Sequence, residues 1–118
     1  MGNAGKPLIW RSGEIKTSPF STAAGIEAGT LLRRLQLGGK IGLSHARPLP
    51  SIGRRCYELR VRDAEQNSRI VYRIDADAIV IVEVFAKQSS TTPRRIIETC
   101  ITRLKTYEEL TRGEGDEP

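Results

Sequence analysis

Aromatic residues, cysteine and histidine are all scarce in this chain of 118 residues. Aromatic residues make up 5% of it, and it has two cysteines, Cys56 and Cys100, and one histidine, His45. Two cysteines among apolar neighbours are too few for a disulfide scaffold, so we expect reduced thiols in the core. One histidine and two separated cysteines do not form a zinc site, so neither a metal nor another cofactor is predicted.

Long apolar runs are also missing. No run approaches the roughly 20 residues that span a bilayer, and the opening stretch MGNAGKPLIWRSG lacks the apolar region of a signal peptide. These absences predict a soluble, cytoplasmic protein with no membrane partner. The length suits one hydrophobic core, built from Leu, Ile and Val, and we predict a single domain over residues 1–110.

Charge is plentiful but unevenly distributed. The net charge is +5, yet residues 108–118 hold five acidic residues and one arginine, a net charge of −4, so residues 1–107 carry +9. We therefore predict an acidic flexible tail over 111–118. A basic domain of this size is typical of proteins with a polyanionic partner, most often nucleic acid, although basic surfaces also serve solubility alone.

Apolar residues recur at helical spacing in two segments. The first covers 21–37, with Ser21 as N-cap and two glycines after it as the stop. The second covers 93–110, with Thr92 as N-cap and a proline in the first turn. Both segments are predicted to be amphipathic helices.

Between and before the helices, alternating patterns predict strands. They cover 8–10, 56–62, 69–75 and 78–87, and residues 40–55 are predicted as a loop. The last three strands are joined by short polar links, which require antiparallel neighbours. The predicted fold is therefore α+β, a curved antiparallel meander with both helices packed on one face.

The two faces of this predicted meander differ, one being apolar and the other charged. One carries apolar residues that are expected to meet the helices: Tyr57, Leu59, Ile70, Tyr72 and Ile74. The other carries fixed positive charges: Arg60, Arg62, Arg69 and Arg73, with Lys87 at the end of the third long strand. An exposed basic face of this kind suits a phosphate backbone. The alternative is a solvated face whose arginines pair with Glu58 and Glu83 across strands.

Several stretches together resemble a known superfamily. The series PLPSIGRRCYELRV, SRIVYRI and IVIVEVFAKQSSTTP, followed by an amphipathic helix, resembles the RelE/ParE toxins and among them the phage-derived HigB-like branch. The resemblance covers about residues 20–110. It implies the toxin of a type II toxin–antitoxin system, an endoribonuclease that cleaves mRNA on the ribosome, and an antitoxin partner, often a helix-turn-helix protein. A ParE-like inhibitor of a protein target such as gyrase, or a degenerate relative that keeps only partner binding, are the alternatives.

The resemblance also assigns residues. Arg69, Lys87 and Arg60 match basic positions of the RelE-type active face and are the predicted catalytic residues, while the predicted RNA-binding residues are Arg62, Arg73, Arg55 and Gln88. The sequence departs from the pattern where Glu58 and Gln88 replace basic residues and where a C-terminal catalytic tyrosine is expected, because Tyr107 fits the apolar stripe.

The chemistry of RNA cleavage limits what these side chains can do. Attack by a ribose 2′-hydroxyl needs a base, neutralisation of the phosphorane oxygens and an acid at the leaving oxygen. Arginine stays protonated, so it neutralises charge but is a poor base. Lys87, Glu58, Glu83 and His45 remain as candidate proton-transfer groups, and for His45 a surface-loop role is favoured.

Overall fold

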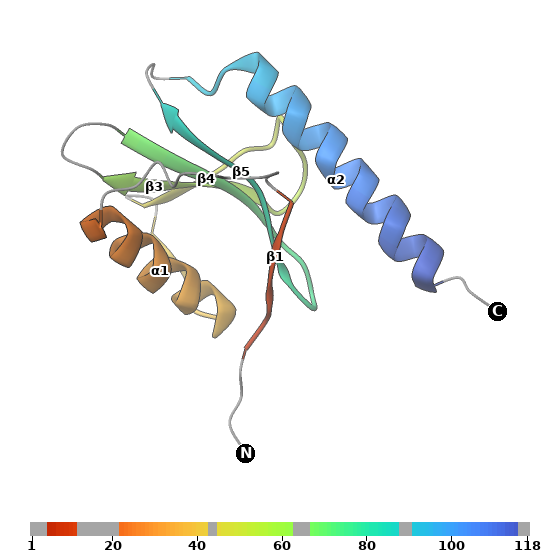
Figure 1. Cartoon of the computed structure of the whole chain (residues 1–118), viewed down its shortest axis with the longest axis horizontal. Helices are drawn as coiled ribbons and strands as arrows, with labels where there is room; N and C mark the ends of the chain where they lie inside the picture. Colours follow the sequence, from red (N-terminus) through yellow and green to blue (C-terminus); the bar gives the residue numbers. More distant parts are fainter. Residues whose placement is uncertain (1–4, 12–21, 43–44, 63–66, 88–90, 116–118) are drawn as a thin grey trace.

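Five strands form one mixed sheet between two helices in the computed structural model, which describes residues 5–11, 22–42, 45–62, 67–87 and 91–115 (Figure 1). The elements are β1 Leu8–Trp10, α1 Thr22–Gln36, β2 Ala46–Pro48, β3 Cys56–Arg62, β4 Asn67–Ile74, β5 Ile79–Lys87 and α2 Arg94–Gly115. The strand order is β1-β5-β4-β3-β2, with β2 to β5 antiparallel and β1 parallel to β5. The predicted α+β class and the antiparallel meander are confirmed.

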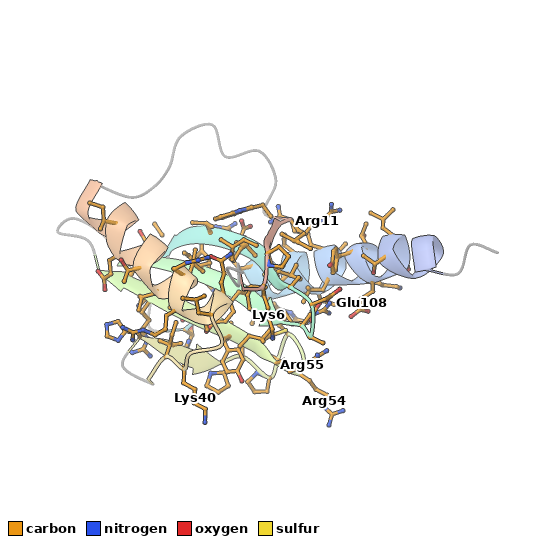
Figure 2. The ribbon with its side chains drawn as sticks, turned by 90° about the horizontal axis from the view of Figure 1, so that it is seen from below. Lys6, Arg11, Lys40, Arg54, Arg55 and Glu108 are labelled. Atoms are coloured by element: carbon orange, nitrogen blue, oxygen red, sulfur yellow. The ribbon has the colours of Figure 1, made fainter. Side chains whose placement is uncertain are left out.

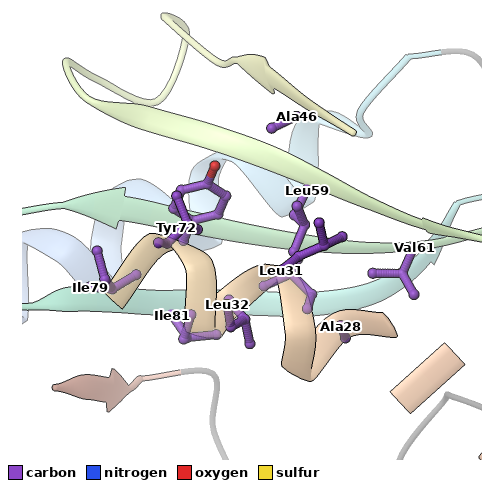
Figure 3. Packing of buried hydrophobic residues seen from close by; sticks show 11 residues of the cluster. Ala28, Leu31, Leu32, Ala46, Leu59, Val61, Tyr72, Ile79 and Ile81 are labelled. Atoms are coloured by element: carbon purple, nitrogen blue, oxygen red, sulfur yellow. The ribbon is translucent and has the colours of Figure 1, made fainter. Parts of the chain in front are cut away.

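The helix α1 covers one face of the sheet through its apolar stripe. Ala28, Leu31, Leu32 and Leu35 are buried, and Figure 3 shows the α1 side chains packed against strand residues. The strand partners in this cluster are Leu59, Val61, Ile70, Tyr72, Ile79 and Ile81. This is the parity that the sequence predicted to be apolar, because side chains two residues apart on a strand share a face.

The second helix packs on the opposite face of the sheet, so the prediction that both helices lie on one face is wrong. Ile96, Cys100 and Leu104 of α2 form a separate buried cluster with Cys56, Val71, Val80, Val82 and Leu49. In β5, Ile79 and Ile81 belong to the α1 cluster while their neighbours belong to the α2 cluster. An almost continuously apolar strand is apolar on both faces, and each face needs a covering element.

A bulge in β5 shapes the face beneath α2. Val82 has no partner residue in β4, which shifts the register so that Glu83 pairs with Val71. Arg103 of α2 donates a hydrogen bond from Nη1 to the Val82 carbonyl at 2.8 Å and lies 3.2 Å from Glu83 Oε1. The same carboxylate accepts a hydrogen bond from the Val84 amide at 3.1 Å. The polar groups that the bulge removes from the ladder are therefore satisfied by α2 and by a local carboxylate.

The segment around β2 was predicted as a loop, but Ala46–Pro48 pairs with β3, in register from Ala46↔Leu59 to Pro48↔Tyr57. A segment of three residues that ends in proline is too short and too weakly patterned to be recognised as a strand from sequence. An edge strand tolerates the proline.

At the C-terminal end of the described residues, α2 continues to Gly115, so residues 111–115 of the predicted flexible tail are helical. Residues 116–118 lie outside the described residues.

The end of α1 is fixed by two backbone hydrogen bonds. The Gly38 amide donates to the Leu35 carbonyl at 3.0 Å and the Gly39 amide donates to the Arg34 carbonyl at 2.9 Å. Gly38 has φ 84°, the left-handed conformation that closes a helix in this pattern. The predicted stop is confirmed, whereas the predicted N-cap, Ser21, lies outside the described residues.

Gly38→Ala is therefore expected to lower the free energy of unfolding by about 1–2 kcal/mol, because an L side chain at positive φ is strained. Gly29→Ala is the matched control. Gly29 lies inside α1, and a Cβ added there would have open space around it, so the change is expected to stabilise by about 0.5–1 kcal/mol. Urea denaturation of both variants measures the difference, and equal stabilities would contradict the assignment of Gly38 as a left-handed cap.

Candidate functional site

Two of the three predicted catalytic residues lie side by side on the sheet. Arg60 of β3 and Arg69 of β4 are partners in the β3–β4 register, so their side chains share the face on which α2 packs. The buried cluster beneath α2 includes Cys56 and Val71 but neither of these arginines. Like charges placed directly opposite each other on a sheet are destabilising, so this pair needs compensation or a function.

Compensation comes from Glu58, whose side chain is 0% exposed on the same face. Its Oε1 lies 3.2 Å from Arg47 Nε and 3.5 Å from Arg69 Nε. Its Oε2 accepts a hydrogen bond of 2.6 Å from the Thr92 hydroxyl. A buried carboxylate is tolerated only when it is paired and hydrogen-bonded in this way. The alternative prediction, that the arginines pair with Glu58, is correct for Arg69.

The compensation is incomplete. The group of Arg47, Arg60 and Arg69 with Glu58, called here the arginine cluster, holds three guanidinium groups and one carboxylate. Arg60 Nε is buried without a hydrogen-bond partner among the described residues, and the contact of Arg69 Nε with Glu58 is a charge contact rather than a hydrogen bond. Burial lowers the pKa of Arg69, Glu58 opposes that effect, and Arg60 and Arg47 reinforce it. Among the described residues, two positive charges are thus in excess at a partly desolvated site, which favours binding of an anion.

Three other predicted residues fall near or beyond this cluster. Arg62 ends β3 and Lys87 ends β5, and both are in register with Asn67 of β4, two residues along from Arg69. The backbone therefore brings both close to the arginine cluster. Gln88 lies outside the described residues.

Arg73 is not on an open face, contrary to the expectation. It lies four residues from Arg69 along β4, about 13 Å at the rise of a strand, and is buried under α2. Its guanidinium donates to both Asp75 oxygens, at 2.7 and 3.0 Å, and to Glu108 of α2, and lies 6.0 Å from the centre of the Tyr107 ring. Burial alone would lower the pKa of Arg73, but the hydrogen bonds to Asp75 and Glu108 raise it.

Arg55 lies with this second group rather than with Arg69. Its Nη2 is 3.9 Å from Asp75 Oδ1, and it projects with Arg54 from the loop before β3 (Figure 2). The loop and α2 enclose a cavity of about 360 Å³ that Arg73 and Glu108 also line. The predicted basic residues thus form two groups, one around Glu58 and one around Asp75.

The remaining candidate proton-transfer groups are engaged elsewhere. His45 is exposed, with Nε2 3.9 Å from Glu27 of α1, and Glu83 is tied to the bulge and to Arg103. Tyr107 packs against the buried cluster beneath α2, as the apolar stripe predicted, and its ring also lies beside Arg73. Both cysteines are buried and free, as expected, and burial raises the pKa of Cys100 to about 12.

Two residues of the site, Arg47 in the cluster and Thr92 beside it, were missed by sequence reasoning. Arg47 was assigned to a loop, and the signal that could have placed it is the edge strand Ala46–Pro48, which sets Arg47 opposite Glu58. Thr92 was predicted as the N-cap of α2, but the Pro93 carbonyl accepts the first helical amides, of Ile96 and Ile97. The Thr92 hydroxyl binds Glu58 instead.

A protein-family model matches most of this chain. The model of the family described as "Phage derived protein Gp49-like (DUF891)" matches residues 18–105, about three quarters of the chain. The chain belongs to this family. Gp49-like proteins are a RelE-like family related to the toxins of toxin–antitoxin systems, which implies an antitoxin as partner. No curated protein matches the chain.

Two further features of this Gp49-like protein bear on its chemistry. Within the part of the chain that the structure describes, no helix is long and apolar enough to cross a membrane. In the same residues, no group of three or more His, Cys, Asp or Glu side chains could hold a metal ion. The described part of the candidate site consists of the side chains of the arginine cluster and of Thr92.

Proposed function

We propose that this Gp49-like protein is a HigB-like toxin of a type II toxin–antitoxin system and an endoribonuclease that cleaves ribosome-bound mRNA in the cytoplasm. The observation that carries the proposal is the arginine cluster: Arg60 and Arg69 are held opposite each other, and together with Arg47 they leave two positive charges in excess among the described residues after Glu58 is counted. Such an arrangement stabilises an anion more than it stabilises the fold, since like charges repel until an anion binds.

In the proposed reaction the ribose 2′-oxygen attacks the adjacent phosphorus, and the bond from phosphorus to the 5′-oxygen breaks. The products are a 2′,3′-cyclic phosphate and a free 5′-hydroxyl. Arg60 and Arg69 neutralise the charge that develops on the non-bridging oxygens, where preorganised donors are most effective. A base takes the 2′-hydroxyl proton and an acid protonates the 5′-oxygen; Lys87 is proposed for one of these transfers because it ends β5 next to the cluster.

The phosphates on either side of the scissile one also need contacts. Arg62 and Gln88 are proposed to bind them, since Arg62 continues β3 beyond Arg60 and Gln88 follows Lys87 in sequence. Arg55 and Arg73 are left out of this proposal, because both lie with Asp75 at the other end of the face. The proposed protein partner is an antitoxin, for example a helix-turn-helix protein, that blocks the basic face.

The decisive experiment is primer extension on mRNA in a cell-free translation system with added protein, alongside gyrase supercoiling. New 5′ ends at the ribosomal A site are expected with wild type and not with Arg69→Ala. Binding of a short single-stranded RNA should also weaken steeply with salt, with a slope of about −0.7 per phosphate contacted. Intact mRNA with blocked supercoiling would favour a ParE-like inhibitor, and neither effect would favour a relative that keeps only partner binding.

A further inference from the structure

The carboxylate of Glu58 is buried at the point where three elements meet. Arg47 comes from β2, Arg69 from β4, and Thr92 from the segment just before α2. All three contact Glu58, which lies on β3 between β2 and β4. One side chain thus links two strands and the start of a helix to the arginine cluster.

The contacts engage two of the three nitrogens of each guanidinium. Glu58 Oε1 meets Arg47 and Arg69 through their Nε atoms, at 3.2 and 3.5 Å. Thr92 donates to Glu58 Oε2 at 2.6 Å, and its hydroxyl oxygen accepts a hydrogen bond of 3.4 Å from Arg47 Nη2. Arg69 Nη1 also donates to the Ser68 carbonyl at 3.1 Å. The Arg47 guanidinium is therefore held by two hydrogen bonds, and the Arg69 guanidinium by one hydrogen bond and one charge contact.

We propose that Glu58 and Thr92 are positioning residues that hold Arg47 and Arg69 for substrate, and that Arg47 is a third phosphate-binding residue beside Arg60 and Arg69. The proposal rests on the proposed function and deepens it. Arg47 has the necessary access, because its side chain is 33% exposed while Arg69 is 14% exposed. Nitrogens that Glu58 does not contact remain for a phosphate, which guanidinium groups bind through paired N–H donors.

A purely structural role explains this arrangement less well. A buried ion pair is seldom more stable than apolar residues of the same volume. A structural pair would also be neutral, whereas the described residues around this carboxylate carry an excess of positive charge. Holding the Arg47 and Arg69 side chains in place lowers the stability of the fold, but the two side chains then need no ordering when a phosphate binds.

Thr92→Val and Thr92→Ser form a matched pair of variants. Valine keeps the size and branching of threonine but removes the hydroxyl that bridges Glu58 and Arg47, whereas serine keeps the hydroxyl. Glu58→Gln is the second variant, because it keeps the shape and removes the charge. Since Glu58→Gln risks misfolding, the threonine pair provides the decisive comparison.

Two measurements on the full chain are needed. The first is hydrogen exchange at the arginine Nε–H groups by NMR without RNA, which reports whether Arg47 and Arg69 are held. The second is the cleavage rate of ribosome-bound mRNA at increasing protein concentration, which separates the maximal rate from the half-saturating concentration. Thr92→Val is expected to speed Nε–H exchange of Arg47 about tenfold and to lower the maximal rate about tenfold or more, because small displacements of catalytic groups are costly. Thr92→Ser should restore both.

The proposal is overturned if Arg47 and Arg69 exchange as fast in wild type as in Thr92→Val and Glu58→Gln, or if exchange speeds up while cleavage is unchanged. It is also overturned in part if Arg47→Ala cleaves at the wild-type rate, since Arg47 would then contact no phosphate. If wild type itself cuts no mRNA, the proposed function fails separately. The salt dependence of binding to a short RNA then takes the place of cleavage: a slope that Arg47→Ala and Thr92→Val leave unchanged rejects the positioning role.

Discussion

Arg69→Ala is expected to slow mRNA cleavage about a hundredfold or more, because one preorganised charge is lost at the phosphorane. Stability is expected to fall as well, by about 1–2 kcal/mol, since the fully buried Glu58 keeps Arg47 and Thr92 but loses one charged partner. This corrects the expectation from sequence that Arg69 lies on an exposed face, since its side chain is 14% exposed.

The measurement combines growth arrest on expression in a bacterium, cleavage in the translation extract, and thermal melting of purified protein. Arg34→Ala is the control. Arg34 is an exposed arginine on α1, which covers the opposite face of the sheet, so its loss removes the same charge without touching the cluster. Toxicity of Arg69→Ala equal to wild type would reject the arginine cluster as the site of cleavage.

Arg73→Ala is expected to have the largest effect on stability, lowering the free energy of unfolding by about 2–4 kcal/mol. The Arg73 side chain is 9% exposed and joins Asp75 and Glu108, so its removal leaves the largely buried Asp75 carboxylate with only the contact to Arg55 at 3.9 Å among the described residues. This expected loss in the free energy of unfolding is smaller than for a fully buried ion pair, because Glu108 is half exposed. Cleavage by the folded fraction is expected to be normal, because Arg73 is not part of the arginine cluster.

Arg94→Ala provides the comparison for this prediction. Arg94 also pairs with a carboxylate, Glu98, but its side chain is 91% exposed, so its removal should change stability by less than about 0.5 kcal/mol. Chemical denaturation of the two variants at several temperatures tests the contrast. Similar denaturation midpoints for Arg73→Ala and Arg94→Ala would mean that the pairing of Arg73 under α2 contributes little to stability.

The fold could be predicted from sequence wherever one periodicity dominated. The alternation in 56–62 and the helical spacing in 21–37 each have one apolar face, so each gave the correct element. The run IVIVEVFAK has no such preference, because α1 and α2 pack on its two faces and a bulge at Val82 changes its parity. The run itself indicated burial on both sides, which required a helix on each face.

The site was harder to predict because charge alone does not distinguish a free cation from a paired one. Arg60, Arg69 and Arg73 share one parity, and only the positions of Asp75 and Glu108 separate Arg73 from the others. Glu58 looked like a departure from a basic pattern, yet it is the residue around which the cluster is built. Long-range partners of this kind, such as Thr92, which is 34 residues from Glu58, leave no periodic signal.

The parallel pairing of β1 with β5 has a consequence for how the chain is made. Leu8 pairs with Ile79, about seventy residues later, so during synthesis the first strand must wait for its partner to leave the ribosome. Closing so long a loop is slow compared with forming the adjacent meander. Until it closes, the edge of the most apolar strand is open to another chain. Nascent molecules are therefore most prone to self-association late in synthesis, and a partner that binds early would also act as a chaperone for this edge.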